Sequence, residues 1–167
     1  MLDLGTGSGA IALAVAHEAP SAIITATDQS SDALAIAIAN AEALHLASHV
    51  QFLQGSWYEA LREQTLFDLI LSNPPYIAND DPHLSQGDLR FEPISALTDR
   101  DSGLTCLEAI IQGALEHLKP MALIAVEHGF DQSEAVVNLM KGAGFHNIQN
   151  HQDLAGHHRV VSGRKLG

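Results

Sequence analysis

Short apolar runs alternate with longer helical runs along the chain, and this alternation is the feature that most constrains the fold. The pattern predicts strands at 2–4, 23–28, 50–53, 67–72 and 121–127, and helices at 10–18, 31–46, 103–119 and 132–142. Ser31 is the expected N-cap of the second helix. Such an alternation is typical of a doubly wound α/β domain with a mostly parallel sheet, which 145–151 and 158–163 would close as an antiparallel pair.

Composition and charge narrow the classes of function. The 167 residues have the length of one domain, and no apolar run is long enough to span a bilayer. The single cysteine excludes an internal disulfide and fits a reducing cytoplasm, where we expect the protein to work. Twenty acidic and eight basic residues give a net charge of −12, so we expect no direct binding to nucleic acid and no membrane association.

A glycine-rich loop, Gly5-Thr6-Gly7-Ser8-Gly9, directly follows the first strand and opens a helix. Glycines at such a turn let the backbone approach a ligand, while the helix N–H groups point into the crevice. Asp28 ends the second strand, at the spacing where a carboxylate binds ribose hydroxyls. Nicotinamide-dependent enzymes and methyltransferases both use this arrangement, so these residues alone leave both classes open.

The tetrad Asn73-Pro74-Pro75-Tyr76 follows the continuous apolar run 67–72, at the edge of the sheet where ligands bind. The Asn73 side-chain oxygen and the Pro74 carbonyl could accept hydrogen bonds from the N–H groups of a planar amide or amine. Consecutive prolines would hold that carbonyl rigidly, and Tyr76 offers a flat face for stacking. The tetrad therefore predicts a site that orients a nitrogen for in-line group transfer, the alternative being a proline turn that only ends a strand.

These residues also carry a family resemblance. The string Asp3-Leu4-Gly5-Thr6-Gly7-Ser8-Gly9 resembles motif I of class I S-adenosylmethionine-dependent methyltransferases, which have a Rossmann-like fold. From Leu2 to about Arg164, the chain resembles the catalytic domain of the peptide chain release factor N5-glutamine methyltransferases, the HemK/PrmC family. The resemblance includes the strings at 81–84, Gly87-Asp88-Leu89-Arg90-Phe91-Glu92-Pro93, Asp101-Ser102-Gly103 and Glu127-His128-Gly129.

The resemblance implies a role for each candidate site residue. The residues expected to contact S-adenosyl-L-methionine are Asp3, Gly5, Thr6, Gly7, Ser8, Gly9, Asp28, Ser56, Trp57 and Asn73. The residues expected to hold the substrate glutamine are Asn73, Pro74, Pro75 and Tyr76, of which Asn73, Pro74 and Tyr76 are the expected catalytic residues. Asp3 would help to hold the methionine moiety. Ser56 stands where many relatives have an aspartate, and its hydroxyl is a weaker acceptor for the adenine amino group, which lowers the expected cofactor affinity.

Other sequence features carry weaker implications. Glu127 and His128 are expected to have a structural role in the pocket, and Glu92 to support its loop or to touch the substrate. His45 and His49 have no third ligand nearby, so no metal site is expected.

The resemblance implies methyl transfer to a glutamine of peptide chain release factors, which would be the protein partners. The alternatives are a ribosomal protein glutamine, N6-adenine or N2-guanine of nucleic acid, and an inactive domain that only binds the cofactor. The helical N-terminal domain with which the family docks its substrate is absent from the sequence. We therefore expect residues 1–167 to be the methyltransferase domain alone, a fragment that lacks part of the first-strand region.

Overall fold

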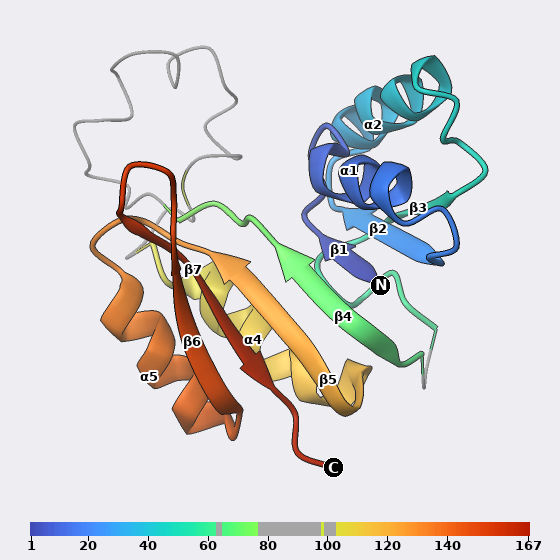
Figure 1. The fold of residues 1–167 in the computed structure, drawn as a ribbon. Coiled ribbons are helices and arrows are strands. Elements are labelled where there is room, and N and C mark those ends of the chain that lie inside the picture. Colours follow the sequence, from blue (N-terminus) through green and yellow to red (C-terminus); the bar gives the residue numbers. More distant parts are fainter. Residues whose placement is uncertain (63–64, 77–97, 99–102) are drawn as a thin grey trace.

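The computed structural model describes residues 1–62, 65–76, 98 and 103–167, which form one twisted sheet with helices on both faces (Figure 1). The strands are β1 (Leu2–Leu4), β2 (Ile24–Asp28), β3 (Val50–Gln54), β4 (Phe67–Ser72), β5 (Leu118–Glu127), β6 (His146–Gln152) and β7 (His158–Arg164). The helices are α1 (Ala10–Glu18), α2 (Ser31–Ala43), α4 (Thr105–His117) and α5 (Ser133–Ala143).

The strand order is β3-β2-β1-β4-β5-β7-β6. Strands β1 to β5 are parallel, and β7 runs antiparallel to both β5 and β6. The predicted mostly parallel sheet with a terminal antiparallel pair is therefore confirmed. The order reverses between β1 and β4, and in open α/β sheets a reversal of this kind is where ligands bind.

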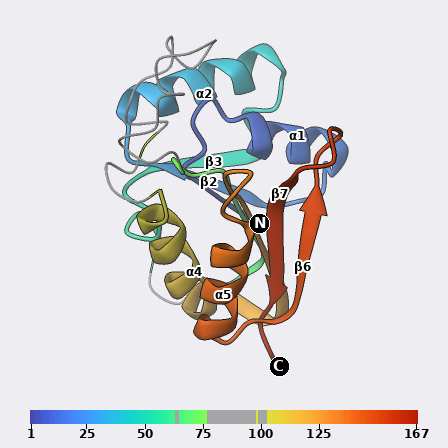
Figure 2. The ribbon, with the colours of Figure 1, turned by 90° about the vertical axis from the view of Figure 1, so that its left-hand side faces the viewer.

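Two apolar clusters cover opposite faces of the sheet. One packs α1 and α2 against β2 and β3, and the other packs α4 and α5 against β1, β4, β5 and β7. Figure 2 shows α4 and α5 side by side along the second half of the sheet. Successive side chains of β1 point to opposite faces of the sheet. Leu2 and Leu4 join the cluster of α4 and α5, while Asp3 between them accepts a hydrogen bond from the Ala12 amide of α1.

The N-cap prediction for α2 was wrong by one residue. Ser30, and not Ser31, is the N-cap, and its hydroxyl accepts a hydrogen bond from the Ala33 amide at 3.2 Å. The helix also ends at Ala43, three residues earlier than predicted, because the chain turns through His45 with φ at 60°.

The boundary between α4 and β5 also differs from the prediction. The helix ends at His117, and β5 begins at Leu118, which pairs with Phe67 of β4. Lys119, predicted as the last helical residue, lies in the strand instead and donates to Asp68 at 2.8 Å. The strand continues through Pro120, opposite a register shift between Phe67 and Leu69 of β4.

Gly113 and Gly142 both lie in helices, but only Gly113 is closely packed. A Cβ at Gly113 of α4 would lie 2.6 Å from the ring of Tyr58, whereas a Cβ at Gly142 of α5 meets nothing within 4 Å in the described part of the chain. The Tyr58 ring cannot move away easily, because its hydroxyl donates to the Ile110 carbonyl at 2.7 Å and its face stacks on His117.

We expect Gly142→Ala to raise the free energy of unfolding by up to about 1 kcal/mol, the difference in helix propensity. Gly113→Ala should lower it by about 1–3 kcal/mol, because overpacking outweighs propensity. Urea unfolding followed by circular dichroism measures both. Stabilisation of similar size in the two variants would contradict the packing at Gly113.

Candidate active site

The two predicted motifs meet where β1 and β4 end. Leu4 pairs with Ser72 in the parallel register, so Gly5 and Asn73 are the next residues on neighbouring strands. The buried Ser72 hydroxyl donates to the Leu4 carbonyl at 2.7 Å and ties the two strand ends together. The structure thus brings the glycine loop beside the tetrad, as the sequence predicted.

The predicted site residues lie in or directly after the carboxyl-terminal parts of parallel strands. Asp3, Thr6, Gly9 and Pro74 are buried, Gly5, Gly7, Asp28, Ser56, Trp57, Pro75 and Tyr76 are half-buried, and Ser8 and Asn73 are exposed.

The glycine loop needs its glycines for two different reasons. Gly9 precedes α1 with φ at 84°, and a Cβ there would lie 3.1 Å from Leu13 and 3.2 Å from Ala37, so glycine lets α1 and α2 pack closely. Gly7 has φ at 56°, and a Cβ there would meet no described residue within 4 Å. The backbone at Gly7 is therefore open to a ligand.

Asp28 holds the loop in place. Its Oδ2 accepts a hydrogen bond from the Gly7 amide and its Oδ1 one from the Ser30 amide, both at 2.9 Å. The Thr6 amide adds a bond to the Thr27 carbonyl at 2.9 Å. Because a carboxylate offers about four acceptor positions, Asp28 can still accept from ligand hydroxyls. The sequence did not indicate this second, structural role of Asp28.

Asp3 is fully buried beneath the loop and only half satisfied. The Thr6 hydroxyl donates at 2.6 Å and the Ala12 amide at 3.1 Å, both to Oδ2. Oδ1 is buried and has no hydrogen-bond partner among the described residues. Burial raises the pKa of this carboxyl from 3.8 to about 6. A buried acceptor left in this way fits a ligand that carries a cationic amino group.

Trp57 packs against the glycine loop from the β3 side. A Cβ at Gly5 would lie 3.1 Å from the Trp57 ring, so the indole is in contact with the loop backbone. Trp57 has φ at 45°, which is rare for a bulky residue, and its carbonyl accepts a hydrogen bond from the Thr27 hydroxyl at 3.1 Å. Ser56 lies directly before it, and the Gly55 amide donates to the Asp28 carbonyl at 3.0 Å. The turn after β3 is thus fixed to the end of β2.

The tetrad is tied to the end of β5 and the start of α5. The Tyr76 hydroxyl donates to Glu127 at 3.1 Å, and the Tyr76 carbonyl accepts from the Gln132 side chain at 2.9 Å. A structural role in the pocket is what we expected of Glu127, and this contact supports that role. Gln132 is not among the site residues predicted from the sequence, where its only link to the site is its place five residues after Glu127.

His128, which lies between Glu127 and Gln132 in the sequence, is fully buried. Its Nδ1 lies 2.7 Å from the Gly129 carbonyl, which assigns the proton to Nδ1, and burial lowers the pKa of the imidazole. Its Nε2 has no partner within the described parts of the chain. A buried neutral imidazole in this position supports the structural role expected of it.

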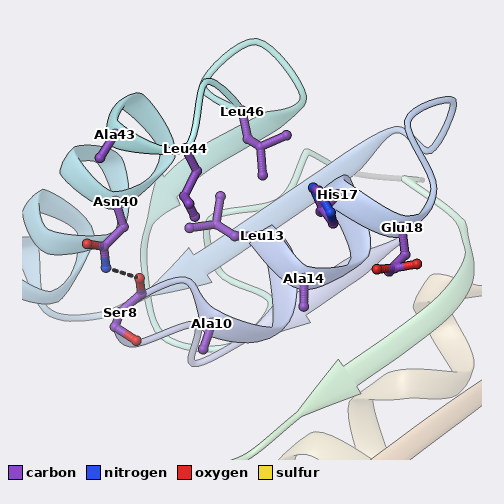
Figure 3. A pocket seen from close by; sticks show the side chains of 10 residues that line it. All are labelled: Ser8, Ala10, Leu13, Ala14, His17, Glu18, Asn40, Ala43, Leu44 and Leu46. Atoms are coloured by element: carbon purple, nitrogen blue, oxygen red, sulfur yellow. Dashed lines mark hydrogen bonds between the residues drawn. The ribbon is translucent and has the colours of Figure 1, made fainter.

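A separate groove of about 740 Å³ lies between α1 and α2. Of its lining residues, Ser8 alone belongs to the glycine loop, and the Ser8 carbonyl accepts a hydrogen bond from Asn40 at 2.9 Å (Figure 3). Most of the other lining residues are alanines and leucines, which offer no polar group for a ligand. The motifs and their hydrogen bonds identify the β1–β4 edge, and not this groove, as the candidate site.

Some predictions fall on other parts of the chain. The strings at 81–84 and 87–93, with Glu92, and residues 101–102 lie outside the described residues. Among the described residues, no group of three His, Cys, Asp or Glu side chains could hold a metal ion. None of the described helices is long and apolar enough to cross a membrane.

Comparison with known proteins identifies the family. A family model described as the methyltransferase small domain matches residues 1–87 of the 167. The chain belongs to this family. Its fold is that of the class I S-adenosylmethionine-dependent methyltransferases, and it superposes on a methyltransferase from Pyrococcus furiosus with a TM-score of 0.73. That match has 19% identity and covers 99% of this chain and 74% of the other, and at such identity it shows the fold alone.

Closer relatives are known from sequence. The release factor glutamine methyltransferase of Bordetella pertussis is 53% identical over 163 residues, which cover 98% of this chain and 60% of that protein. The enzyme of the same name from Xylella fastidiosa strain Temecula1 is 54% identical over 165 residues, covering 99% of this chain and 59% of that protein. The resemblance to this family is therefore confirmed over nearly the whole chain, which spans about 60% of the length of these relatives.

Asp3, a buried carboxyl with one oxygen unpaired among the described residues, should make the free energy of unfolding depend on pH. Because the folded chain binds the Asp3 proton more tightly than the unfolded chain, the free energy of unfolding falls as pH rises from about 4 to above 6. Asn at this position keeps an acceptor for Thr6 and Ala12 and never ionises. The free energy of unfolding of Asp3→Asn, measured relative to that of the unaltered chain, should therefore rise by about 3 kcal/mol between about pH 4 and pH 7.

Urea unfolding at several pH values measures this gain. Asp32→Asn, on the exposed first turn of α2, is the matched control for the same change of side chain at the surface. A flat difference for Asp3→Asn across this range would contradict the buried, half-satisfied carboxylate.

Proposed function

We propose that this chain is the methyl-transferring domain of a cytoplasmic release factor glutamine methyltransferase. It would move a methyl group from S-adenosylmethionine to the N5 side-chain amide nitrogen of a glutamine in a peptide chain release factor. The observation that carries the proposal is the position of the Asn73–Tyr76 tetrad, directly beside the glycine loop at the β1–β4 edge. The names of the similar proteins support the choice of a release factor over a ribosomal protein or a nucleic acid.

The residues around the glycine loop fit the cofactor. S-adenosylmethionine supplies a methyl group that is already activated on a sulfonium. The unpaired Oδ1 of Asp3 suits the ammonium of its methionine moiety, and the spare acceptor positions of Asp28 suit its ribose hydroxyls. The open backbone at Gly7 leaves room for a ligand to approach. Trp57 and Ser56, fixed to the end of β2, border the same loop and suit the adenosine end.

The tetrad would make a weak nucleophile reactive through its position. An amide nitrogen donates its lone pair into the carbonyl, so it must be held in line with the methyl group. The Asn73 side-chain oxygen and the Pro74 carbonyl would each accept one N–H and enrich the nitrogen in electron density. Tyr76 would hold the amide plane against its ring. The nitrogen becomes acidic only once methylated, and its proton then passes to water without a dedicated base.

Charge supports a protein substrate over a nucleic acid. The net charge of −12 opposes the counterion release on which duplex binding depends. A 16S rRNA methyltransferase and a catalytic domain bound to an RNA hairpin share this fold at 21% and 17% identity, and at such identity the likeness concerns the fold alone.

The cofactor assignment predicts the effect of Asp28→Ala. Loss of a hydrogen bond between a carboxylate and a ribose hydroxyl should weaken S-adenosylmethionine binding by on the order of 1.5–3 kcal/mol. Isothermal titration calorimetry measures it, with the exposed Asp32→Ala as the control that should bind normally. Tight binding of NADH without binding of S-adenosylmethionine would refute the assignment.

The substrate assignment predicts the effect of Asn73→Ala. Methyl transfer should fall by roughly 10²–10³, the scale for loss of one preorganised polar contact, and cofactor affinity should fall as well because Asn73 adjoins the loop. Labelled S-adenosylmethionine is incubated with a short glutamine peptide or an intact release factor, and mass spectrometry locates the methyl group. Asn138→Ala, exposed on α5, is the control. Unaltered turnover of Asn73→Ala would mean that the tetrad is only a turn.

A further inference from the structure

The side-chain amide of Gln132 joins three segments that lie far apart in sequence. Its Nε2 donates to the Tyr76 carbonyl at 2.9 Å and to the Gly103 carbonyl at 3.2 Å. Its Oε1 accepts from the Gly129 amide at 2.9 Å. Only this orientation of the amide presents its two N–H groups to two carbonyls and its oxygen to an N–H. Gln132 therefore connects the last residue of the tetrad, the approach to α4 and the turn after β5.

The packing around this amide leaves little freedom. A Cβ at Gly103 would lie 2.4 Å from the Tyr76 carbonyl oxygen and 2.7 Å from Gln132 Nε2. Gly103 also has φ at 79°, a conformation that favours glycine. The backbone at Gly103 is thus pressed against the contact between Tyr76 and Gln132, so that neither group can shift without losing a bond.

The other end of Tyr76 is held from the same connection. Its hydroxyl donates to Glu127, the last residue of β5, whereas Gln132 is the N-cap of α5. The connection is itself anchored, because the His128 amide donates to the Arg159 carbonyl at 2.9 Å and the Gln132 amide to the Gly129 carbonyl at 3.0 Å. The turn between β5 and α5 therefore fixes both the backbone and the ring of Tyr76.

We propose that Gln132 is a positioning residue for the methyl acceptor, which sets the Tyr76 ring at the angle needed to hold a planar amide in line with the methyl group. The inference rests on the proposed function and adds a residue to it. Methyl transfer depends steeply on this angle, since a misplacement of about 1 Å can reduce a rate by about 10². Gln132 acts through Tyr76 and does not itself touch the substrate.

A merely structural role for Gln132 would give a different kinetic pattern. The residues expected to hold the cofactor lie mainly in β1 and the glycine loop after it, at the end of β2 and in the turn after β3, and the described contacts of Gln132 are to none of them. Positioning therefore predicts a lower kcat/KM for glutamine methylation at unaltered cofactor affinity. General destabilisation would lower both.

The test variant is Gln132→Glu, which keeps the acceptor for the Gly129 amide but turns an oxygen toward two carbonyls. We expect kcat/KM for a short glutamine peptide to fall about 10- to 100-fold, with a lower kcat, while calorimetry finds unaltered binding of S-adenosylmethionine. Gln112→Glu, on the exposed side of α4, is the matched control. Gln132→Asn is the milder variant if Gln132→Glu does not fold, and should show a smaller change of the same kind. Equal losses in kcat/KM for the peptide and in cofactor binding, or no loss, would overturn the proposal.

A double-mutant cycle tests whether Gln132 acts through Tyr76. In a Tyr76→Ala background, Gln132→Glu should have no further effect on kcat/KM for the peptide, whereas an additive effect would overturn the proposal.

A readout without substrate separates this inference from the proposed function. The chain has two tyrosines, so ¹³C-labelled tyrosine gives two ring signals, which Tyr76→Phe assigns. Gln132→Glu should shift the Tyr76 signal and leave that of Tyr58 in place. If the shift occurs but the unaltered chain methylates no glutamine, the proposed function fails and the anchoring of Tyr76 stands. An unshifted Tyr76 signal would overturn the anchoring itself.

Discussion

The hydrogen bond from the Ser72 hydroxyl to the Leu4 carbonyl is the contact on which the candidate site depends. It joins the ends of β1 and β4, where the strand order reverses and the two flanking connections leave in opposite directions. The glycine loop and the tetrad begin one residue later, so the register of this pair sets how they face each other. A slip of one residue would turn Asp3 to the wrong face of the sheet and separate the two motifs.

The site is held by contacts that satisfy the backbone but leave strain and, among the described residues, buried polar atoms without a partner. Asp28 binds two backbone amides, and Thr27 holds the carbonyl of Trp57 in a left-handed turn. Asp3 has a buried oxygen without a partner in the described residues, which lowers stability while the site is empty of cations. Departures of this kind from a well-satisfied core are expected at functional sites, where a ligand completes what the chain leaves open.

The sequence predicted the strands before the two motifs better than the ends of α2 and α4. β1, α1 and β4 have the predicted bounds, because an apolar run followed by glycine or proline marks a strand end clearly. The cap of α2 was misplaced because Ser30 and Ser31 are equally good candidates by residue type. Gln132 could not be found in the same way, since its partners Tyr76 and Gly103 lie 56 and 29 residues away and only the fold brings them together.

The two apolar clusters divide the chemistry between two halves of the sheet. The cluster of α1 and α2 supports the loop that fits a cofactor, whereas the cluster of α4 and α5 supports the turn that holds Tyr76. Each cluster packs on its own face of the sheet. Trp57 packs on the larger cluster while its ring lies against Gly5 of the glycine loop, so this indole is a common neighbour of the larger cluster and the loop.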